Sequence, residues 1–191
     1  MTMRVVLGAA LLSGAVLAQG QTNREYYNGR LRASPHEVHE FDAGSCHISI
    51  NYGRPSKRGR DIWGGLVHWD RWWMPGADEA TLITTSKAIV LGDLPVPAGT
   101  HSLYFWPSET KPQLIVNNQT GQFHTQYDQR MDLGRVNMTV TKLSDPVEQL
   151  TFDVEAKADG GMLSLSWDQR RYSASFVSPA GDVVVLKSRR N

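Results

Sequence analysis

The sequence has few of the residues on which several common kinds of protein chemistry depend. Its 191 residues include one cysteine, Cys46, so an intramolecular disulfide, a CxxC redox motif and a zinc site built from several cysteines are excluded by count. Twenty Lys and Arg residues oppose 19 Asp and Glu residues, so the chain has no overall field that would attract nucleic acid. We therefore expect a single globular domain with no nucleic-acid partner.

Motifs of the common catalytic classes are also missing. The chain has no Gly-x-Ser-x-Gly nucleophile elbow and no glycine-rich phosphate loop between a strand and a helix. His36 and His39 are three residues apart, not four as in the zinc-protease motif, and on a strand they would face opposite sides. We expect no metal and no cofactor. Cys46 opens a predicted strand and is expected to be a small buried hydrophobic residue.

The N-terminus has the pattern of a secretory signal peptide. Arg4 precedes an unbroken small and apolar run over residues 5–18, which is shorter than the roughly 20 residues of a membrane span. Cleavage after Ala18 would release a secreted or periplasmic protein. Residues 19–33 are polar and predict a flexible lead-in, residues 34–178 form the domain, and residues 179–191 are a C-terminal strand or tail. No later window is apolar enough to predict a transmembrane segment.

The domain shows the period-two alternation of half-buried strands. Ile48, Ile50 and Tyr52 would lie on one face of a strand, with polar residues between them. The same alternation recurs in 136–140, 150–156, 163–167 and 172–176, and turn residues rich in Gly, Pro and Asn separate the segments. No stretch of helical period interrupts them. The pattern predicts an all-β fold, an antiparallel β-sandwich or jelly-roll-like single domain.

The long loop 53–81 breaks this pattern. It holds four of the six tryptophans, Trp63, Trp69, Trp72 and Trp73, together with several arginines. Indole rings stack on sugars and planar ligands, and guanidinium groups bind carboxylate or phosphate, so the composition suits recognition. It also suits a structural role, in which Trp and Arg stack on each other and Asp78 or Glu79 pairs with Arg54 or Arg60 to fasten the loop.

The motifs of this loop and of the strands after it resemble the DUF2911 family of exported bacterial proteins. The resemblance covers about residues 34–178 and is carried by Ile48 to Tyr52, Gly53-Arg54-Pro55-Ser56, Gly59-Arg60, Gly64-Gly65-Leu66-Val67, Gly76-Ala77-Asp78-Glu79-Ala80-Thr81, Val96-Pro97-Ala98-Gly99-Thr100, Asp132-Leu133-Gly134-Arg135 and Leu165-Ser166-Trp167. It implies secretion and a compact β-rich domain, and no catalytic assignment. Two positions depart from the family pattern: His68-Trp69 stands where Pro-Tyr is typical, and Met74 stands where an arginine is usual.

Three hypotheses for function remain open. The first is a non-enzymatic module that binds a small molecule, glycan or envelope protein through the loop. Its candidate ligand-binding residues are Arg54, Ser56, Arg60, Trp63, Trp73, Asp78, Glu79 and Thr81. The second is an envelope hydrolase that uses a histidine, such as His68 or His101, with Asp78 or Glu79. The third is a purely structural envelope protein in which these residues only hold the loop in place.

Overall fold

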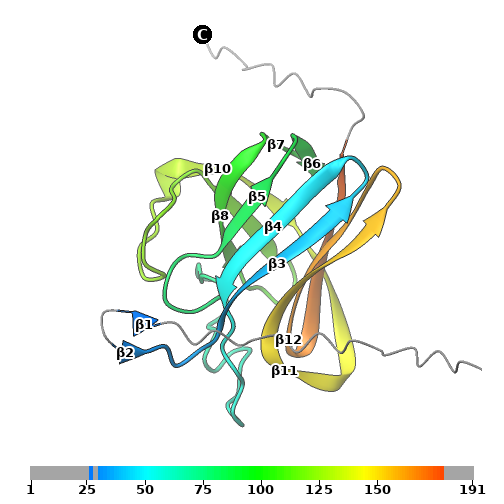
Figure 1. The fold of residues 1–191 in the computed structure, drawn as a ribbon. Helices are drawn as coiled ribbons and strands as arrows, with labels where there is room; N and C mark the ends of the chain where they lie inside the picture. The colour runs from blue at the N-terminus through cyan, green and yellow to red at the C-terminus, as the bar shows by residue number, and fades with distance from the viewer. Residues whose placement is uncertain (1–25, 28–29, 179–191) are drawn as a thin grey trace, which may run out of the picture.

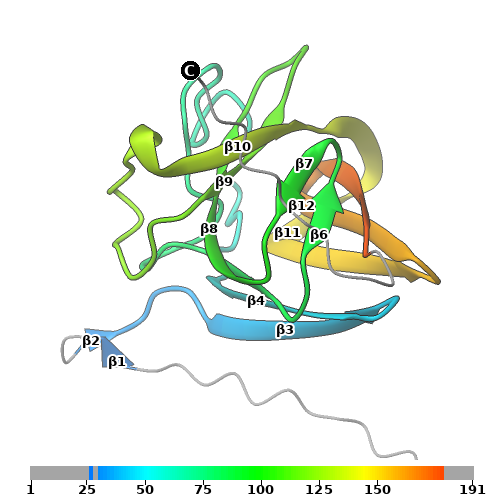
Figure 2. The same ribbon diagram turned by 90° about the horizontal axis from the view of Figure 1, so that it is seen from above.

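Two antiparallel sheets face each other in a computed structural model that describes residues 26–27 and 30–178 (Figures 1 and 2). The predicted signal peptide 1–18, the tail 179–191 and most of the lead-in 19–33 lie outside the described residues. The larger sheet has the order β10-β9-β8-β5-β4-β3. Its strands are β3 (His36–Ala43), β4 (Cys46–Gly53), β5 (Leu82–Thr85), β8 (Gly99–Trp106), β9 (Gln113–Asn117) and β10 (Asp132–Asn137).

The second sheet has the order β11-β12-β6-β7. A long hairpin of β11 (Thr139–Lys157) and β12 (Gly160–Val177) makes up most of it, and β6 (Ile89–Leu91) and β7 (Leu94–Val96) complete it. A separate ribbon pairs β1 (Tyr26–Tyr27) with β2 (Arg30–Leu31), and a short 3-10 turn, η1 (Gln129–Met131), precedes β10. The predicted sandwich is confirmed.

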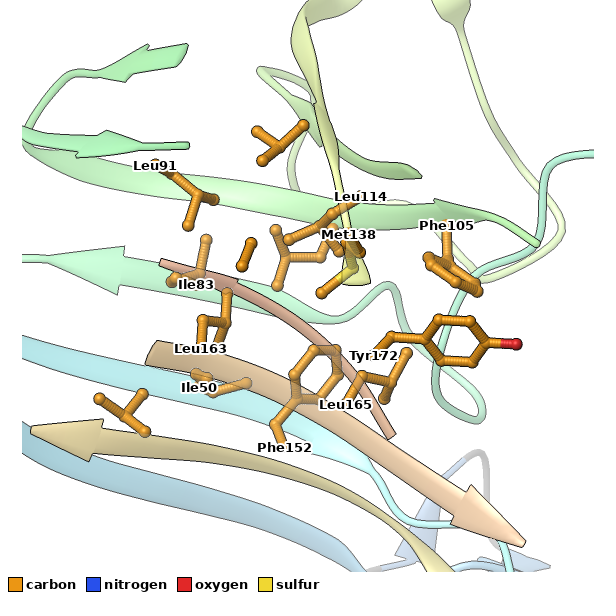
Figure 3. Packing of buried hydrophobic residues seen from close by; sticks show 14 of the residues in the cluster. Ile50, Ile83, Leu91, Phe105, Leu114, Met138, Phe152, Leu163, Leu165 and Tyr172 are labelled. Carbon is orange, nitrogen blue, oxygen red and sulfur yellow. The ribbon is translucent and has the colours of Figure 1, made fainter. Parts of the chain in front are cut away.

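The alternation in β4 shows why these segments form strands. Cys46, Ile48, Ile50 and Tyr52 are buried, and the residues between them are exposed or partly exposed. A strand with this pattern buries one face against the opposite sheet, which supplies Phe152, Leu163, Leu165 and Tyr172 (Figure 3). Trp167 of the same sheet belongs to this core as well. Cys46 is free and buried, as expected.

The predicted strand 136–140 is interrupted at Met138. β10 ends at Asn137 and β11 begins at Thr139, so the chain passes from one sheet to the other at this residue. Met138 stays buried, and its backbone N–H donates to the carbonyl of Pro112 at 2.9 Å. The apolar alternation continues across the crossing because the crossing residue also packs in the core, which is why alternation alone does not reveal it.

A second, smaller apolar cluster covers the outward face of β8 and β9. Met74, Ala80, Tyr104 and Ile115 are buried there, with Trp72, Trp106 and Tyr127 packed against them. Two irregular segments form this cover: the end of the loop 53–81 and the connection 118–131. The Tyr104 hydroxyl donates to the carbonyl of Gln126 at 2.6 Å and so anchors the connection to the sheet. The sandwich therefore carries a partial third layer on one side.

Candidate functional site

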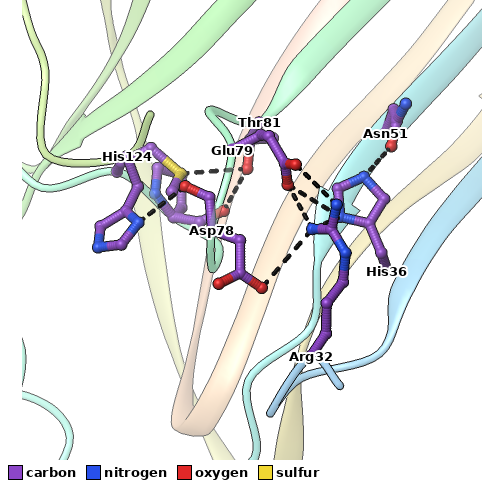
Figure 4. Close-up of polar contacts among 9 residues, drawn as sticks. Arg32, His36, Asn51, Asp78, Glu79, Thr81 and His124 are labelled. Atoms are coloured by element: carbon purple, nitrogen blue, oxygen red, sulfur yellow. Dashed lines mark hydrogen bonds and ion pairs between the residues drawn. The ribbon is translucent and has the colours of Figure 1, made fainter. Parts of the chain in front are cut away.

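An arginine outside the loop 53–81 fastens its last turn. Arg32 precedes β3, and its Nη2 donates to Glu79 Oε1 at 2.6 Å while its Nη1 donates to Glu79 Oε2 (Figure 4). Its Nη1 also lies 3.6 Å from Asp78 Oδ2. The acidic pair therefore has Arg32 as its partner, not Arg54 or Arg60 as expected. The hydrogen bonds from Arg32 hold the pKa of the Glu79 carboxyl below its ordinary value.

Arg54 ties the two sheets together. Its Nη1 donates to Glu37 Oε2 at 2.6 Å in β3, and its Nη2 donates to Thr151 Oγ1 at 2.9 Å in β11. Burial opposes ionisation of Glu37, but hydrogen bonds from His39 and Arg54 outweigh it and lower the pKa of that carboxyl. Tyr52 lies beside this group, and burial raises the pKa of its hydroxyl to about 12. These contacts are structural and leave Arg54 directed into the sandwich.

The tryptophans of the loop pack against the core. The Nε1 of Trp63 donates to the Trp167 carbonyl at 3.0 Å, and its ring lies edge-on to Tyr172 at 4.9 Å. Trp73 stacks on Trp167, with ring centroids 5.9 Å apart and an interplanar angle of 11°. Arg170 lies over Trp69 at 4.9 Å from the ring centroid. Part of the Trp and Arg content is thus explained by packing alone.

A cavity of about 480 Å³ opens between this loop, the connection 118–131 and β12. We call it the tryptophan cavity, and its lining residues are Pro55, Arg60, Leu66, His68, Arg71, Trp72, Trp73, Met74, Gly76, His124, Thr125 and Trp167. Its floor is apolar, because Trp167 and Met74 form it. These two side chains are 1% and 2% exposed. Its rim is basic, with Arg60, His68 and Arg71 exposed to solvent. Among the described residues that line it, none is a carboxylate.

The eight predicted binding residues separate into different places. Arg60 and Trp73 line the tryptophan cavity. Trp63 lines a separate polar cavity of about 440 Å³ beside Asp61 and Asp168, and Glu79 lines a third of about 240 Å³.

The other four hold the loop in place. Arg54 bridges the sheets, and Ser56 forms an isolated bridge with Gln149. The Asp78 carbonyl accepts from His124, and the Thr81 hydroxyl donates to the Pro75 carbonyl at 2.8 Å.

Several cavity residues were not predicted. Trp72 and Arg71 belong to the tryptophan- and arginine-rich cluster that the sequence marks, so composition could have included them. No sequence pattern near His124 indicates that it belongs to the cavity. It reaches the cavity because Glu79 and Phe123 pair as an isolated antiparallel bridge, and its Nδ1 donates to the Asp78 carbonyl at 2.8 Å.

Among the described residues, the histidine that faces the Glu79 carboxylate is His36, and His124 contacts the Asp78 carbonyl; neither His68 nor His101 contacts the acidic pair. His36 Nδ1 lies 3.8 Å from Glu79 Oε2, and its Nε2 lies 2.5 Å from Asn51 Oδ1 (Figure 4). His101 is buried between the Asn118 side chain and the Pro97 carbonyl, and His68 lies on the rim of the tryptophan cavity. Because both oxygens of Glu79 are held by Arg32, this carboxylate is a weak base.

The described part of the chain has neither a cluster of metal-ligating side chains nor a membrane-spanning helix. Residues 26–27 and 30–178 contain no group of three or more His, Cys, Asp or Glu side chains that could hold a metal ion. No helix within these ranges has the length and apolar character needed to cross a bilayer.

Comparison with known proteins identifies the family. A family model described as a protein of unknown function, DUF2911, matches residues 34–176. The chain belongs to the DUF2911 family. The search of curated proteins and the search of solved structures each returned no match. Met74, one of the two positions noted above as departing from the expected family pattern, lines the tryptophan cavity.

Proposed function

We propose that this DUF2911 protein is an exported, non-enzymatic module that binds a small ring-containing molecule, such as a sugar or an aromatic compound, in the tryptophan cavity. One observation carries the proposal: Trp72 and Trp73 of the loop 53–81 line the same cavity as Trp167 of β12. A cavity of about 480 Å³ falls within the usual size range of small-molecule sites. Flat indole faces bind sugar rings and aromatic rings by stacking and apolar contact.

The absence of a carboxylate from the cavity lining supports binding over hydrolysis by paired acids. No carboxylate is found among the described lining residues of the cavity, and hydrolysis by paired acids needs two of them across the substrate. Neither carboxylate of the alternative hypothesis, Asp78 or Glu79, lines this cavity. Arg32 donates to Glu79 and lies 3.6 Å from Asp78 Oδ2. An envelope hydrolase built on His68 or His101 with Glu79 therefore has no observation in its favour.

Export is supported by the N-terminal sequence, with Arg4 followed by the apolar run 5–18. Fractionation of the producing cells and intact-mass measurement test it directly. We expect the protein outside the cytoplasm with residues 1–18 removed. An uncleaved protein in the cytoplasm would contradict export and leave the binding proposal standing.

Binding is tested by a thermal-shift screen of the purified protein against monosaccharides, oligosaccharides and aromatic metabolites, followed by titration of intrinsic tryptophan fluorescence. A ligand that binds only the folded state raises the melting temperature. Trp72→Leu removes one ring from the cavity. Trp106→Leu is the matched control, because Trp106 packs in the same outer cluster and does not line the cavity.

We expect Trp72→Leu to weaken the ligand by about 3- to 10-fold, the size of one aromatic contact, while Trp106→Leu leaves affinity unchanged. Equal effects of the two substitutions would place the ligand elsewhere. A screen in which no ring compound raises the melting temperature would refute the proposed function.

A further inference from the structure

The rim of the tryptophan cavity is basic on two sides. Arg60, His68 and Arg71 come from the loop 53–81, and His124 comes from the connection 118–131. No described lining residue offsets their charge with a carboxylate. The basic groups thus surround the opening of an apolar cavity. A molecule bound there would contact the basic rim at one end and the apolar floor at the other.

The two rim arginines differ in their partners from several other arginines of the described residues. Arg32, Arg54 and Arg130 each form an ion pair with a carboxylate. Within the described residues, neither Arg60 nor Arg71 does.

Arg60 is also oriented by its own loop. Its Nε donates to the Lys57 carbonyl at 2.9 Å and its Nη2 to the Ser56 carbonyl at 2.6 Å. These bonds fix the guanidinium at the rim and leave donors on it for a ligand, because a guanidinium has five N–H groups.

We infer that the ligand is an organic acid, a ring compound that carries a carboxylate or a similar oxyanion. This rests on the proposed function and specifies its ligand. The ring contacts Trp72 and Trp73 over the apolar floor, and the oxyanion accepts hydrogen bonds from Arg60 and Arg71 at the rim. An acidic sugar and an aromatic acid share this chemistry, and the position of Met74 in the floor gives the ring an apolar surface where an arginine would have added a further charge.

Matched pairs of probes test the inference by isothermal titration calorimetry. Glucuronate is compared with glucose, and indole-3-acetate with indole-3-acetamide, at low and high ionic strength. Each pair keeps its ring and changes only the charge. We expect the acid of at least one pair to bind 10-fold or more tightly than its neutral partner, because hydrogen bonds to charged groups contribute more than neutral ones. The pair that responds distinguishes the sugar source from the aromatic source.

The outcomes separate this inference from the proposed function. If the neutral and acidic members of a pair bind equally, the ligand is a ring compound and the acid requirement is wrong. If no ring compound of either charge binds, the proposed function fails and the inference fails with it. Inorganic phosphate alone, binding as tightly as the acids, would also overturn the inference, since the ring would then contribute nothing.

Variants at the rim give a second readout. Arg71→Gln should weaken the acid by about 10-fold and the neutral analogue by much less, and should leave the melting temperature unchanged, because Arg71 is exposed and forms no ion pair within the described residues. Arg71→Lys should recover part of the loss. Lys157→Gln removes the same charge at the hairpin end of β11, beside Gly160, and is the control. Identical behaviour of Arg71→Gln and Lys157→Gln would exclude the rim as the acid-binding element.

Discussion

Arg32 and Glu79 form a two-point ion pair across 47 residues of sequence, with each guanidinium Nη group donating to a different carboxylate oxygen. The Arg32 side chain is 8% exposed and that of Glu79 is 34% exposed. The pair joins the segment before β3 to the end of the loop 53–81, one residue from buried Ala80. The ion pair therefore fastens the end of the loop 53–81 to a segment that lies outside this loop.

Removing either partner should destabilise the fold. We expect Arg32→Ala and Glu79→Gln each to lower the free energy of unfolding by about 1–3 kcal/mol, the range for hydrogen bonds to charged groups, reduced by the exposure of Glu79. Urea denaturation monitored by tryptophan fluorescence measures this. The double variant should lose less than the sum of the two single losses, because both act on one interaction. Strictly additive losses would show that the two side chains do not depend on each other.

The lowered pKa values of Glu37 and Glu79 predict a loss of stability in acid. Each carboxyl has a folded pKa below its unfolded value, so its contribution is complete above the unfolded value of about 4.3 and is lost as the pH falls through the folded pKa. We expect the melting temperature to decline below about pH 5. Glu79→Gln should flatten this decline by removing one of the two groups. A variant with the same acid slope as the wild type would contradict the assignment.

Substitution of Arg54 should lower the stability of the fold, and substitution of a rim arginine should lower ligand affinity. Arg54 donates to Glu37 Oε2, Thr151 Oγ1 and the Leu150 carbonyl, so Arg54→Ala removes a charged donor from acceptors in both sheets. We expect a loss of about 2–4 kcal/mol, with ligand affinity of the remaining folded protein unchanged. Arg71→Gln should leave the free energy of unfolding unchanged and weaken ligand binding. An Arg54 variant that folds stably and binds no ligand would move the site toward the interior of the sandwich.

The fold could be predicted because its determinants are local. The alternation in Ile48, Ile50 and Tyr52 lies within one strand, and burial of that face follows from strand geometry. The Met138 crossing was missed because Met138 is buried like Val136 and the apolar alternation of the sequence runs on to Val140, although Val140 is 42% exposed. The sequence thus predicts which segments are strands, but it does not show at which residue the chain passes from one sheet to the other.

The cavity was only partly predictable because its residues meet through tertiary contacts. Trp73 and Arg60 lie in the loop that composition marks. His124 is 46 residues from Asp78, whose carbonyl it contacts, and Trp167 lies in β12. Arg32 is 47 residues from Glu79, and no sequence pattern distinguishes it from Arg54 as the partner. Charge pairing predicts that a buried acid has a partner, and only the fold determines which one.

Gly53 sets how closely the loop approaches the sheet. A Cβ built at Gly53 would lie 2.4 Å from the Ala77 carbonyl oxygen, a backbone atom that cannot move aside without shifting the loop. Gly134 in β10 is a matched control, because its Cβ would lie 2.5 Å from Leu94 Cδ1, the end of a flexible side chain.

We expect Gly53→Ala to cost about 1–3 kcal/mol, the range for a substitution that forces a backbone shift, and Gly134→Ala to cost less. Because Gly76 of the displaced turn lines the tryptophan cavity, Gly53→Ala should also weaken ligand binding, whereas Gly134→Ala should not. Melting curves and a titration of both variants measure the two effects together. A Gly53→Ala protein with normal stability and normal affinity would show that the turn at residues 76–78 moves freely without altering the cavity.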